Sequence, residues 1–172
     1  MKPLLSIVIP SNNRSVLLDE AIGSIITDSG WSSDCELCIS DNSKGDETGT
    51  LIHTKYSGSS QIIYRRSLDA PSLDENVNMA ISMASGEYVW IFGDDDLVVE
   101  DFLTELITYL KSSSPDIIIL NSCSFQEQGQ VEASRLALDS LIVYGPNDND
   151  LFLTDQGAYL TYVPCILIRK KL

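Results

Sequence analysis

The sequence predicts an α/β fold in which helices cover both faces of a mostly parallel, Rossmann-like sheet. Short apolar runs without polar alternation, typical of strands buried on both faces, are separated by segments whose apolar residues recur at helical spacing. Strand, helix and strand follow one another four times with short links, which favours parallel strands joined by crossover helices. No internal repeat or low-complexity linker interrupts the 172 residues, so we expect a single domain over residues 1–172.

Six apolar runs, rich in β-branched and aromatic residues, are the expected strands. They span residues 4–9, 35–39, 61–64, 88–92, 116–120 and 162–168. Pro10 is expected to close the first strand, because proline cannot donate to a sheet ladder. Trp90 and Phe92 are expected in the core. The run after Asp116 is entirely apolar, so we expect that strand to be fully buried in the parallel sheet.

The expected helices carry their apolar residues on one face. They span residues 15–28, 48–56, 73–84, 101–110 and 134–142. Ser15 is a suitable N-cap for the first of them. The polar stretch 126–130 predicts a turn or hairpin, and the stretch 144–150 predicts a loop before the last strand.

Charge and hydropathy limit the possible functions. The chain has 11 Lys and Arg against 25 Asp and Glu, a formal net charge of −14, which argues against nucleic acid as a partner because phosphate binding needs a basic face. No apolar run is long enough to span a bilayer and the N-terminus lacks a signal-peptide pattern, so we expect a cytoplasmic location. Cys35 and Cys38 have the spacing of redox or zinc sites, but within a strand they would face opposite sides of the sheet, so we expect buried thiols.

An acidic cluster follows the strand at 88–92 directly, in the order Gly93, Asp94, Asp95 and Asp96. Like charges a few ångströms apart repel by roughly 1 kcal/mol or more even in water-like surroundings. A divalent cation would offset this repulsion, and Mg²⁺ or Mn²⁺ sites take one or two carboxylates and leave the other positions to water and phosphates. The structural alternatives are a solvated acidic loop, or a helix N-terminus at which Asp96 caps a helix from about Val99.

Three polar loops follow expected strands: residues 11–14, 40–46 and 94–96. The carboxyl ends of parallel strands meet at one edge of the sheet, so these loops are expected to converge on one crevice. A dinucleotide fingerprint would require G-x-G-x-x-G after the first strand, and residues 10–14 contain no glycine. The sequence therefore argues against NAD or FAD.

Four segments, in order along the chain, resemble signatures of the inverting family-two glycosyltransferases with the GT-A fold. They are the opening strand and loop (6–14), the strand that ends in Asp-Asn-Ser (39–48), the asparagine-containing helix with its Gly-Glu-Tyr junction (78–89), and the acidic run (93–96). The resemblance covers residues 4–110. It implies a nucleotide-binding part at 1–110 and the start of an acceptor-side part at 111–172, in a chain that ends sooner than typical members.

The resemblance also implies roles for individual residues. Asp41 would accept a hydrogen bond from the base, with uracil N3–H as the expected donor, and Asp95 aligns best with the metal-binding carboxylate. Gly93 stands where many relatives have the first aspartate of D-x-D, so Asp94 or Asp96 could reach the ribose or complete the metal shell. The implied nucleotide-binding residues are Pro10, Ser11, Asn13, Arg14, Asp41, Asn42, Ser43, Asn78 and Asp94, and the implied metal ligands are Asp94, Asp95 and Asp96.

The implied reaction is the transfer of a sugar, with inversion, from a nucleoside-diphosphate sugar of the UDP type to a glycan or lipid-linked acceptor in surface polysaccharide biosynthesis. Mn²⁺ or Mg²⁺ would be the cofactor. In relatives the general base is an Asp or Glu in the second half of the domain, where Asp148, Asp150 and Asp155 are the candidates, none of them in a motif that aligns. The basic residues 169–171 could associate peripherally with the inner face of a membrane.

The same residues argue against two other functions. A sugar-phosphate nucleotidyltransferase would need a glycine-rich, basic loop after the first strand, and residues 11–14 do not form one. A non-catalytic, Mg²⁺-binding acidic switch domain would need acidic residues at the end of the first strand, and Pro10 and Ser11 offer none there.

Overall fold

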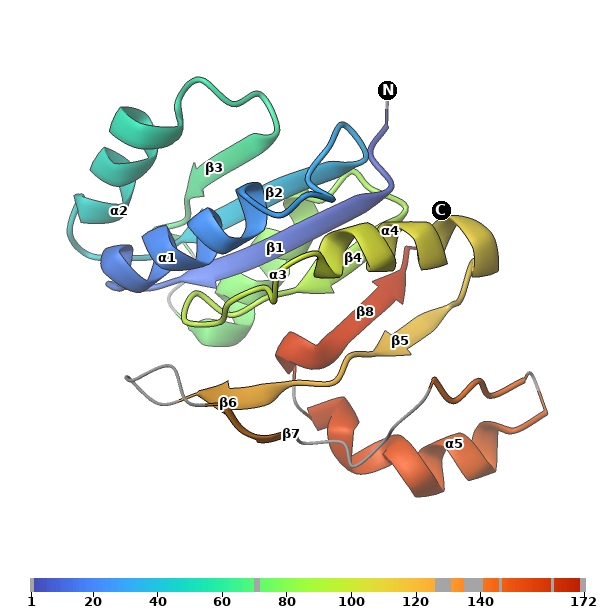
Figure 1. Ribbon diagram of the computed structural model, residues 1–172. Coiled ribbons are helices and arrows are strands. Elements are labelled where there is room, and N and C mark those ends of the chain that lie inside the picture. Colours follow the sequence, from blue (N-terminus) through green and yellow to red (C-terminus); the bar gives the residue numbers. More distant parts are fainter. Residues whose placement is uncertain are drawn as a thin grey trace.

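The computed structural model describes residues 2–69, 72–125, 131–134, 141–145, 147–161 and 163–170, and its central layer is a six-stranded sheet (Figure 1). Its strand order is β3-β2-β1-β4-β8-β5. The strands are β1 (Leu5–Ser11), β2 (Cys35–Asp41), β3 (Ile62–Arg66), β4 (Tyr88–Ile91), β5 (Ile117–Ile119) and β8 (Ile166–Arg169). The first four are parallel, and β8 is antiparallel to both of its neighbours. A separate antiparallel pair joins β6 (Cys123–Phe125) to β7 (Val131–Ser134).

Helices cover both faces of the parallel strands. They are α1 (Ser15–Ile26), α2 (Glu47–Leu51) with a π-helical continuation (Ile52–Tyr56), α3 (Leu73–Met83), α4 (Phe102–Ser113) and α5 (Asn149–Gln156). Figure 1 shows α1 and α4 in front of the sheet and α3 behind it. The side chain of Ser72 caps α3 by accepting a bond from the Glu75 amide, and the Glu75 carboxylate accepts one from the Ser72 amide. The predicted fold class is confirmed.

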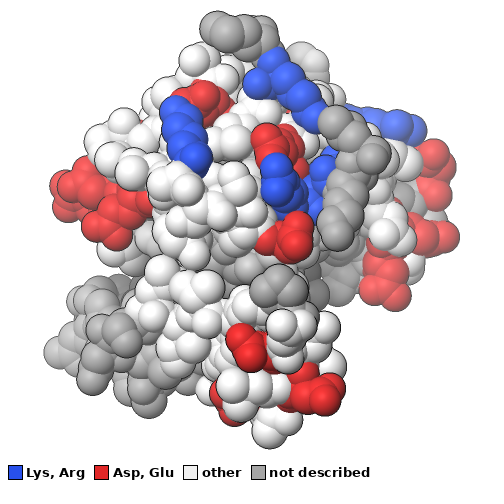
Figure 2. All heavy atoms as spheres, turned by 90° about the vertical axis from the view of Figure 1, so that its right-hand side faces the viewer, with Lys and Arg blue, Asp and Glu red and all other residues white. Residues whose placement is uncertain are grey.

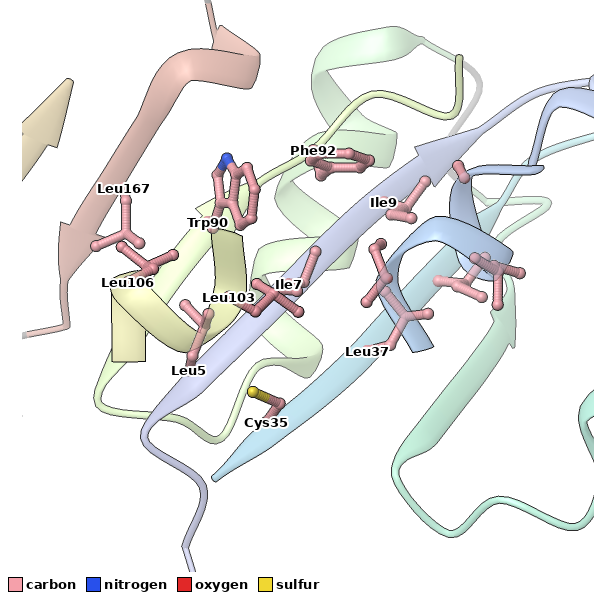
Figure 3. Packing of buried hydrophobic residues seen from close by; sticks show 14 of the residues in the cluster. Leu5, Ile7, Ile9, Cys35, Leu37, Trp90, Phe92, Leu103, Leu106 and Leu167 are labelled. Carbon is pink, nitrogen blue, oxygen red and sulfur yellow. The ribbon is translucent and has the colours of Figure 1, made fainter. Parts of the chain in front are cut away.

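Alternation along β1 divides the core between the two faces. Leu5, Ile7 and Ile9 pack on the side of α1 and α4, where Figure 3 shows them beside Leu37, Trp90 and Leu103. Val8 lies on the other face with residues of β2, α3 and β4. Trp90 and Phe92 are buried, as expected, and the Trp90 indole donates to the Pro164 carbonyl at 2.9 Å.

The two closely spaced cysteines are on opposite faces of β2. Cys35 belongs to the core cluster under α1 and α4, whereas Cys38 packs in the smaller cluster under α3. Burial raises the pKa of both thiols, that of Cys38 to about 12. The expectation of buried, unpaired thiols is confirmed.

Pro10 does not close the first strand, which runs on to Ser11. The carbonyl of Val8 accepts from the Phe92 amide, so the backbone of residue 10, two positions on, faces the same side of the strand. On that side the pairing with β4 ends at Val8 and Ile91. The missing N–H therefore removes no ladder bond, and the prediction was wrong because the neighbouring strand is short.

The strand after Asp116 is not a fully buried member of the parallel set. β5 is at the edge of the sheet, pairs only with β8, and leaves Ile117 39% exposed. β8 lies between β4 and β5 and contributes the fully buried Leu167 to the core (Figure 1). β8, which comes from the C-terminal part of the chain, thus separates β5 from the parallel strands.

The second half of the chain departs most from its predicted elements. Ser134 ends β7 and residues 141–145 have no regular structure, so neither end of the predicted helix at 134–142 is helical; residues 135–140 lie outside the described part of the chain. The predicted turn at 126–130 also lies outside it, and the strands on either side pair as a hairpin. α5 begins inside the predicted loop, and the last strand begins at Ile166 rather than 162.

Two helix starts also differ from expectation. Arg14, not Ser15, is the N-cap of α1, and no side-chain hydrogen bond caps that helix. α4 begins at Phe102, so the alternative in which Asp96 caps a helix near Val99 was wrong. Within the described ranges, no helix has both the length and the hydropathy needed to cross a membrane.

Two glycines allow a direct test of how the segment after α1 packs against α4. A Cβ on Gly30 would lie 2.3 Å from the backbone nitrogen of Thr104, whereas a Cβ on Gly23, inside α1, would have no neighbour within 4 Å. We expect Gly30→Ala to lower the free energy of unfolding by about 1–3 kcal/mol because α4 must move. Gly23→Ala should raise it by about 0.5–1 kcal/mol through helix propensity. Denaturant unfolding followed by circular dichroism measures both, and equal effects would contradict the packing.

Candidate functional site

The three polar loops converge at the carboxyl edge of the sheet, as the sequence predicts. Ser11 and Asp41 are paired in register at the ends of β1 and β2, and the Asn42 amide donates to the Ser11 carbonyl at 3.2 Å. The Ser11 hydroxyl donates to the Asp94 carboxylate at 2.9 Å, although the two residues are 83 positions apart. Ser11 therefore links the loop after β1 to the loops after β2 and β4.

Several hydrogen bonds join the loops after β1 and β2. Asn12 donates from its amide side chain to the Asn42 side chain at 2.7 Å, and the Asn13 backbone amide donates to the Ser43 hydroxyl at 2.7 Å. The Asn13 side chain accepts from the Lys44 amide at 3.2 Å. Asn13 has a φ of 55°, in the left-handed region that asparagine tolerates better than most residues. The paired loops form one side of the site at this edge of the sheet.

Asp41, the last residue of β2, is buried, and both of its carboxylate oxygens accept hydrogen bonds. Oδ1 accepts from the Ser43 amide and Oδ2 accepts from the Tyr64 hydroxyl, each at 2.9 Å, and the residue is 0% exposed. Burial and the bond to Asp41 raise the pKa of Tyr64, so this phenol stays protonated as a donor. The sequence did not single out Tyr64. Its hydroxyl donates to one oxygen of the Asp41 carboxylate, the group that the resemblance assigns to the base.

Asn76, rather than Asn78, is the residue of α3 that reaches the loops. It is 2% exposed, donates to the Ser11 carbonyl at 3.1 Å and to the Asn42 side chain at 3.2 Å, and accepts from the Ser40 hydroxyl at 2.6 Å. Asn78 is exposed and is not brought to the site. Helical spacing could have indicated this, because Asn76 lies four residues before the buried Ala80 and shares its face.

Asp94 and Asp95 share one guanidinium nitrogen of Arg14. That nitrogen lies 3.1 Å from Asp94 Oδ1 and 2.9 Å from Asp95 Oδ2. Burial raises the pKa of Asp94, and the hydrogen bond from Ser11 and the charge of Arg14 oppose that rise. The two carboxylates in turn raise the pKa of Arg14, Asp94 more strongly. Arg14 therefore offsets the repulsion between these carboxylates, which a divalent cation was expected to offset.

The three aspartates differ in how well they suit a metal ion. The Asp94 side chain is 8% exposed and accepts at both oxygens, whereas the Asp95 side chain is 53% exposed and faces solvent. A Cβ on Gly93 would lie 2.4 Å from an Asp96 oxygen, so glycine leaves room for that carboxylate to fold back. Among the residues that the structure describes, no three His, Cys, Asp or Glu side chains form a ready metal cage. The donor set fits a cation held by Asp95 and by oxygens of a phosphorylated ligand.

Comparison with known proteins shows the family of this chain. A model of glycosyl transferase family 2 matches residues 6–172. The chain belongs to this family. It is 33% identical over 178 residues to the abequosyltransferase RfbV of Salmonella typhimurium, in a match that covers 98% of this chain and 53% of that protein. The chain thus spans about half the length of this curated relative.

Solved structures show the same fold. S. aureus TarS 1-349 matches with a TM-score of 0.61 and 18% identity over 68% of this chain and 35% of that one, and it has also been solved with UDP and with UDP-GlcNAc. A mannosyltransferase from Pyrobaculum calidifontis, solved with GDP-Man and Mn²⁺, matches with a TM-score of 0.59 and 18% identity over 70% and 36% of the two chains. At these identities the likeness supports the fold alone.

The three candidate general bases do not lie beside the loops of this site. The Asp148 carboxylate accepts from the Gly145 amide at 2.8 Å, Asp155 accepts from the Tyr144 hydroxyl at 3.1 Å, and Asp150 lies in the first turn of α5. In Figure 1 the carboxyl ends of β1 and β2 point to the left, whereas α5 begins at the far right, below β5. Within the described ranges, no hydrogen bond or ion pair joins these three carboxylates to the site loops.

The opposite, amino edge of the sheet holds a cavity of about 800 Å³ with basic residues around it (Figure 2). Its charges are largely paired within the chain: Lys111 with Asp34 and Arg169 with Glu87, both at 2.7 Å. Lys170 donates to the Ala84 carbonyl at 2.8 Å, and residue 171 lies outside the described part. Membrane association through residues 169–171 stays a prediction.

Asn76 and Asn78 provide a matched pair of variants. Asn76→Ala should lower the free energy of unfolding by about 1–3 kcal/mol, because it leaves the Ser11 carbonyl and the Ser40 hydroxyl with fewer partners in a buried site. Asn78→Ala, on the exposed side of the same helix, should change it by less than about 0.5 kcal/mol. Urea unfolding of the two variants checks this, and a larger loss for Asn78→Ala would show that α3 faces the loops differently.

Proposed function

We propose that this chain is the donor-binding part of a metal-dependent glycosyltransferase that uses a nucleoside-diphosphate sugar of the UDP type. The observation that carries the proposal is that Arg14, Asp94 and Asp95 meet beside the paired loops after β1 and β2, in a chain that belongs to family 2. At this edge, polar side chains that could contact a nucleoside lie next to a carboxylate that could hold a cation. Residues 1–110 would form this donor site, and residues 111–172 would begin the acceptor side.

The residues of this site would contact different parts of the donor. Asp41 and Tyr64 form the buried end of this site, and a nucleobase N–H would bind the Asp41 carboxylate in place of the Tyr64 hydroxyl, which now donates to Oδ2. Asn13, Asn42 and Ser43 hold the loop backbone that borders it, and Asp94 stands between these loops and Asp95, in reach of a ribose. Asn76, which fixes Ser11 and Asn42, replaces Asn78 in our proposal as the residue of α3 that shapes the pocket.

Asp95 would hold Mn²⁺ or Mg²⁺, with Asp96 beside it. When bound, the metal supplies positive charge to the diphosphate leaving group, whose negative charge grows as the bond to the sugar breaks. Arg14 supplies a second positive charge at the same place without any proton transfer. In a protein of net charge −14, these two cations are what allow an anionic donor to approach.

Membership of family 2 supports sugar transfer, and the acceptor and the stereochemistry are further parts of our proposal. We propose transfer with inversion to a glycan or lipid-linked acceptor in surface polysaccharide biosynthesis. The abequosyltransferase relative supports the transfer of a sugar. Inversion needs a general base on the face of the sugar opposite the diphosphate. Asp148, Asp150 and Asp155 are remote from the loops in this structure, so we assign the base to none of them.

Calorimetric titration with UDP, CDP and GDP tests the proposal. We expect Mn²⁺ to strengthen UDP binding by about tenfold or more, equivalent to at least ~1.4 kcal/mol. Asp95→Asn should remove that metal-dependent gain, because the exposed carboxylate that holds the cation is lost. Glu100→Gln removes an exposed charge a few residues further along the chain and is the matched control.

Two results would count against the proposal. Binding of none of the three nucleotides in the presence of Mn²⁺ or Mg²⁺ would remove the donor site altogether. An equal loss of the metal-dependent gain in Asp95→Asn and Glu100→Gln would show that overall charge, not the Asp95 carboxylate, is responsible.

A further inference from the structure

Arg14 occupies the place between the two carboxylates at which a metal-binding loop is expected to receive its cation. A single guanidinium nitrogen contacts both Asp94 and Asp95, at 3.1 Å and 2.9 Å. The side chains of Arg14 and Asp95 are 51% and 53% exposed, so this contact can open without unpacking the core. Asp94, in contrast, is also held by the buried Ser11.

A divalent cation and the guanidinium cannot both keep their preferred positions at Asp95. Mg²⁺ approaches its oxygen ligands to about 2.1 Å and keeps several waters around it. A guanidinium nitrogen within hydrogen-bond distance of the same carboxylate would lie in that hydration shell, and the two positive charges would repel. Because Ser11 holds Asp94 in place, Asp95 is the contact that gives way.

We propose that Arg14 is a positioning residue that holds Asp94 and Asp95 together before the donor arrives, and that the metal displaces it from Asp95 so that it can bind the donor diphosphate. This inference rests on the proposed function. Arg14 is the N-cap of α1, so its backbone is fixed at the crevice while its long side chain can turn from one anion to another. A diphosphate offers the same bidentate acceptors as a carboxylate pair.

The exchange makes metal and nucleotide bind cooperatively. Without nucleotide, the metal must break the contact between Arg14 and Asp95, and this lowers metal affinity. With nucleotide present, Arg14 has another anion to pair with, so the same contact opens at little cost. Thermodynamic linkage requires the effect to be reciprocal, so the metal strengthens nucleotide binding by the same factor.

The test measures Mn²⁺ binding without nucleotide, by the electron paramagnetic resonance signal of free Mn²⁺. Arg14→Gln should bind Mn²⁺ roughly three- to tenfold more tightly than the wild type, the size expected when partly exposed ion pairs no longer compete. Lys44→Gln removes the same charge from the neighbouring loop, where the side chain is exposed and has no ion pair with the described carboxylates, and it should change Mn²⁺ affinity by less than about twofold.

The same titrations in the presence of UDP measure the coupling. In Arg14→Gln the strengthening of UDP binding by Mn²⁺ should fall several-fold below the wild-type value. If Arg14→Gln binds Mn²⁺ no more tightly than the wild type, including the case in which neither binds, the exchange is wrong. Equal gains in Arg14→Gln and Lys44→Gln would also overturn it, because a general change in charge would then explain the result.

A measurement on the wild type avoids any dependence on the folding of the variant. In protein labelled with ¹⁵N-arginine, the Arg14 side-chain signal should change on addition of Mg²⁺ alone and change again on addition of UDP, with Arg14→Lys used for its assignment. An Arg14 signal that Mg²⁺ leaves unchanged at saturation contradicts displacement. Failure of UDP, CDP and GDP to bind the wild type would instead refute the proposed function, whereas metal-dependent UDP binding with an unaffected Arg14→Gln variant refutes only this inference.

Discussion

The hydrogen bond from Ser11 to Asp94 is the contact on which the rest of the site depends. It places a carboxylate that is almost fully buried beside the end of the central strand, and burial makes the charged form of that carboxylate costly, as its raised pKa shows. Ser11 and Arg14 together compensate for the lost water. Asp95, the next residue, is half exposed at the same edge of the sheet and shares Arg14 with Asp94.

Ser11 also belongs to a second network on its other side. Its carbonyl accepts from the Asn42 amide and from the Asn76 side chain, which connects β1 to β2 and to α3. Asn76 extends the network to Ser40, and the Ser40 hydroxyl lies 2.8 Å from that of Ser67. These groups are buried and mutually bonded, so they hold one geometry. The wall that would receive a nucleoside is therefore built before any ligand is present.

The two sides of the site differ in burial and in hydrogen bonding, and the difference suits the proposed function. The Asp41 and Asn76 side is buried and fully bonded, whereas Arg14 and Asp95 are each about half exposed. Recognition of a base benefits from preorganisation, because little entropy is then lost on binding. A metal and a diphosphate arrive together with their own charges, and they need side chains that can exchange partners. The chain provides a fixed wall for the first task and movable charges for the second.

Periodicity and loop order in the sequence determined the α/β class, the strands β1 to β4, the helices on them and the meeting of three polar loops at one edge. These features depend on residues a few positions apart, whose alternation and spacing are visible in the chain itself. Only the tertiary structure decided that β8 separates β4 from β5, that Pro10 stays within a strand, and that Asn76 rather than Asn78 faces the loops. It also decided that Tyr64 covers Asp41 and that Arg14 neutralises the acidic run. Each of these depends on a pairing between distant segments, and local patterns do not specify which distant groups will share a buried site, because that choice is made by packing and by the need to satisfy buried charges.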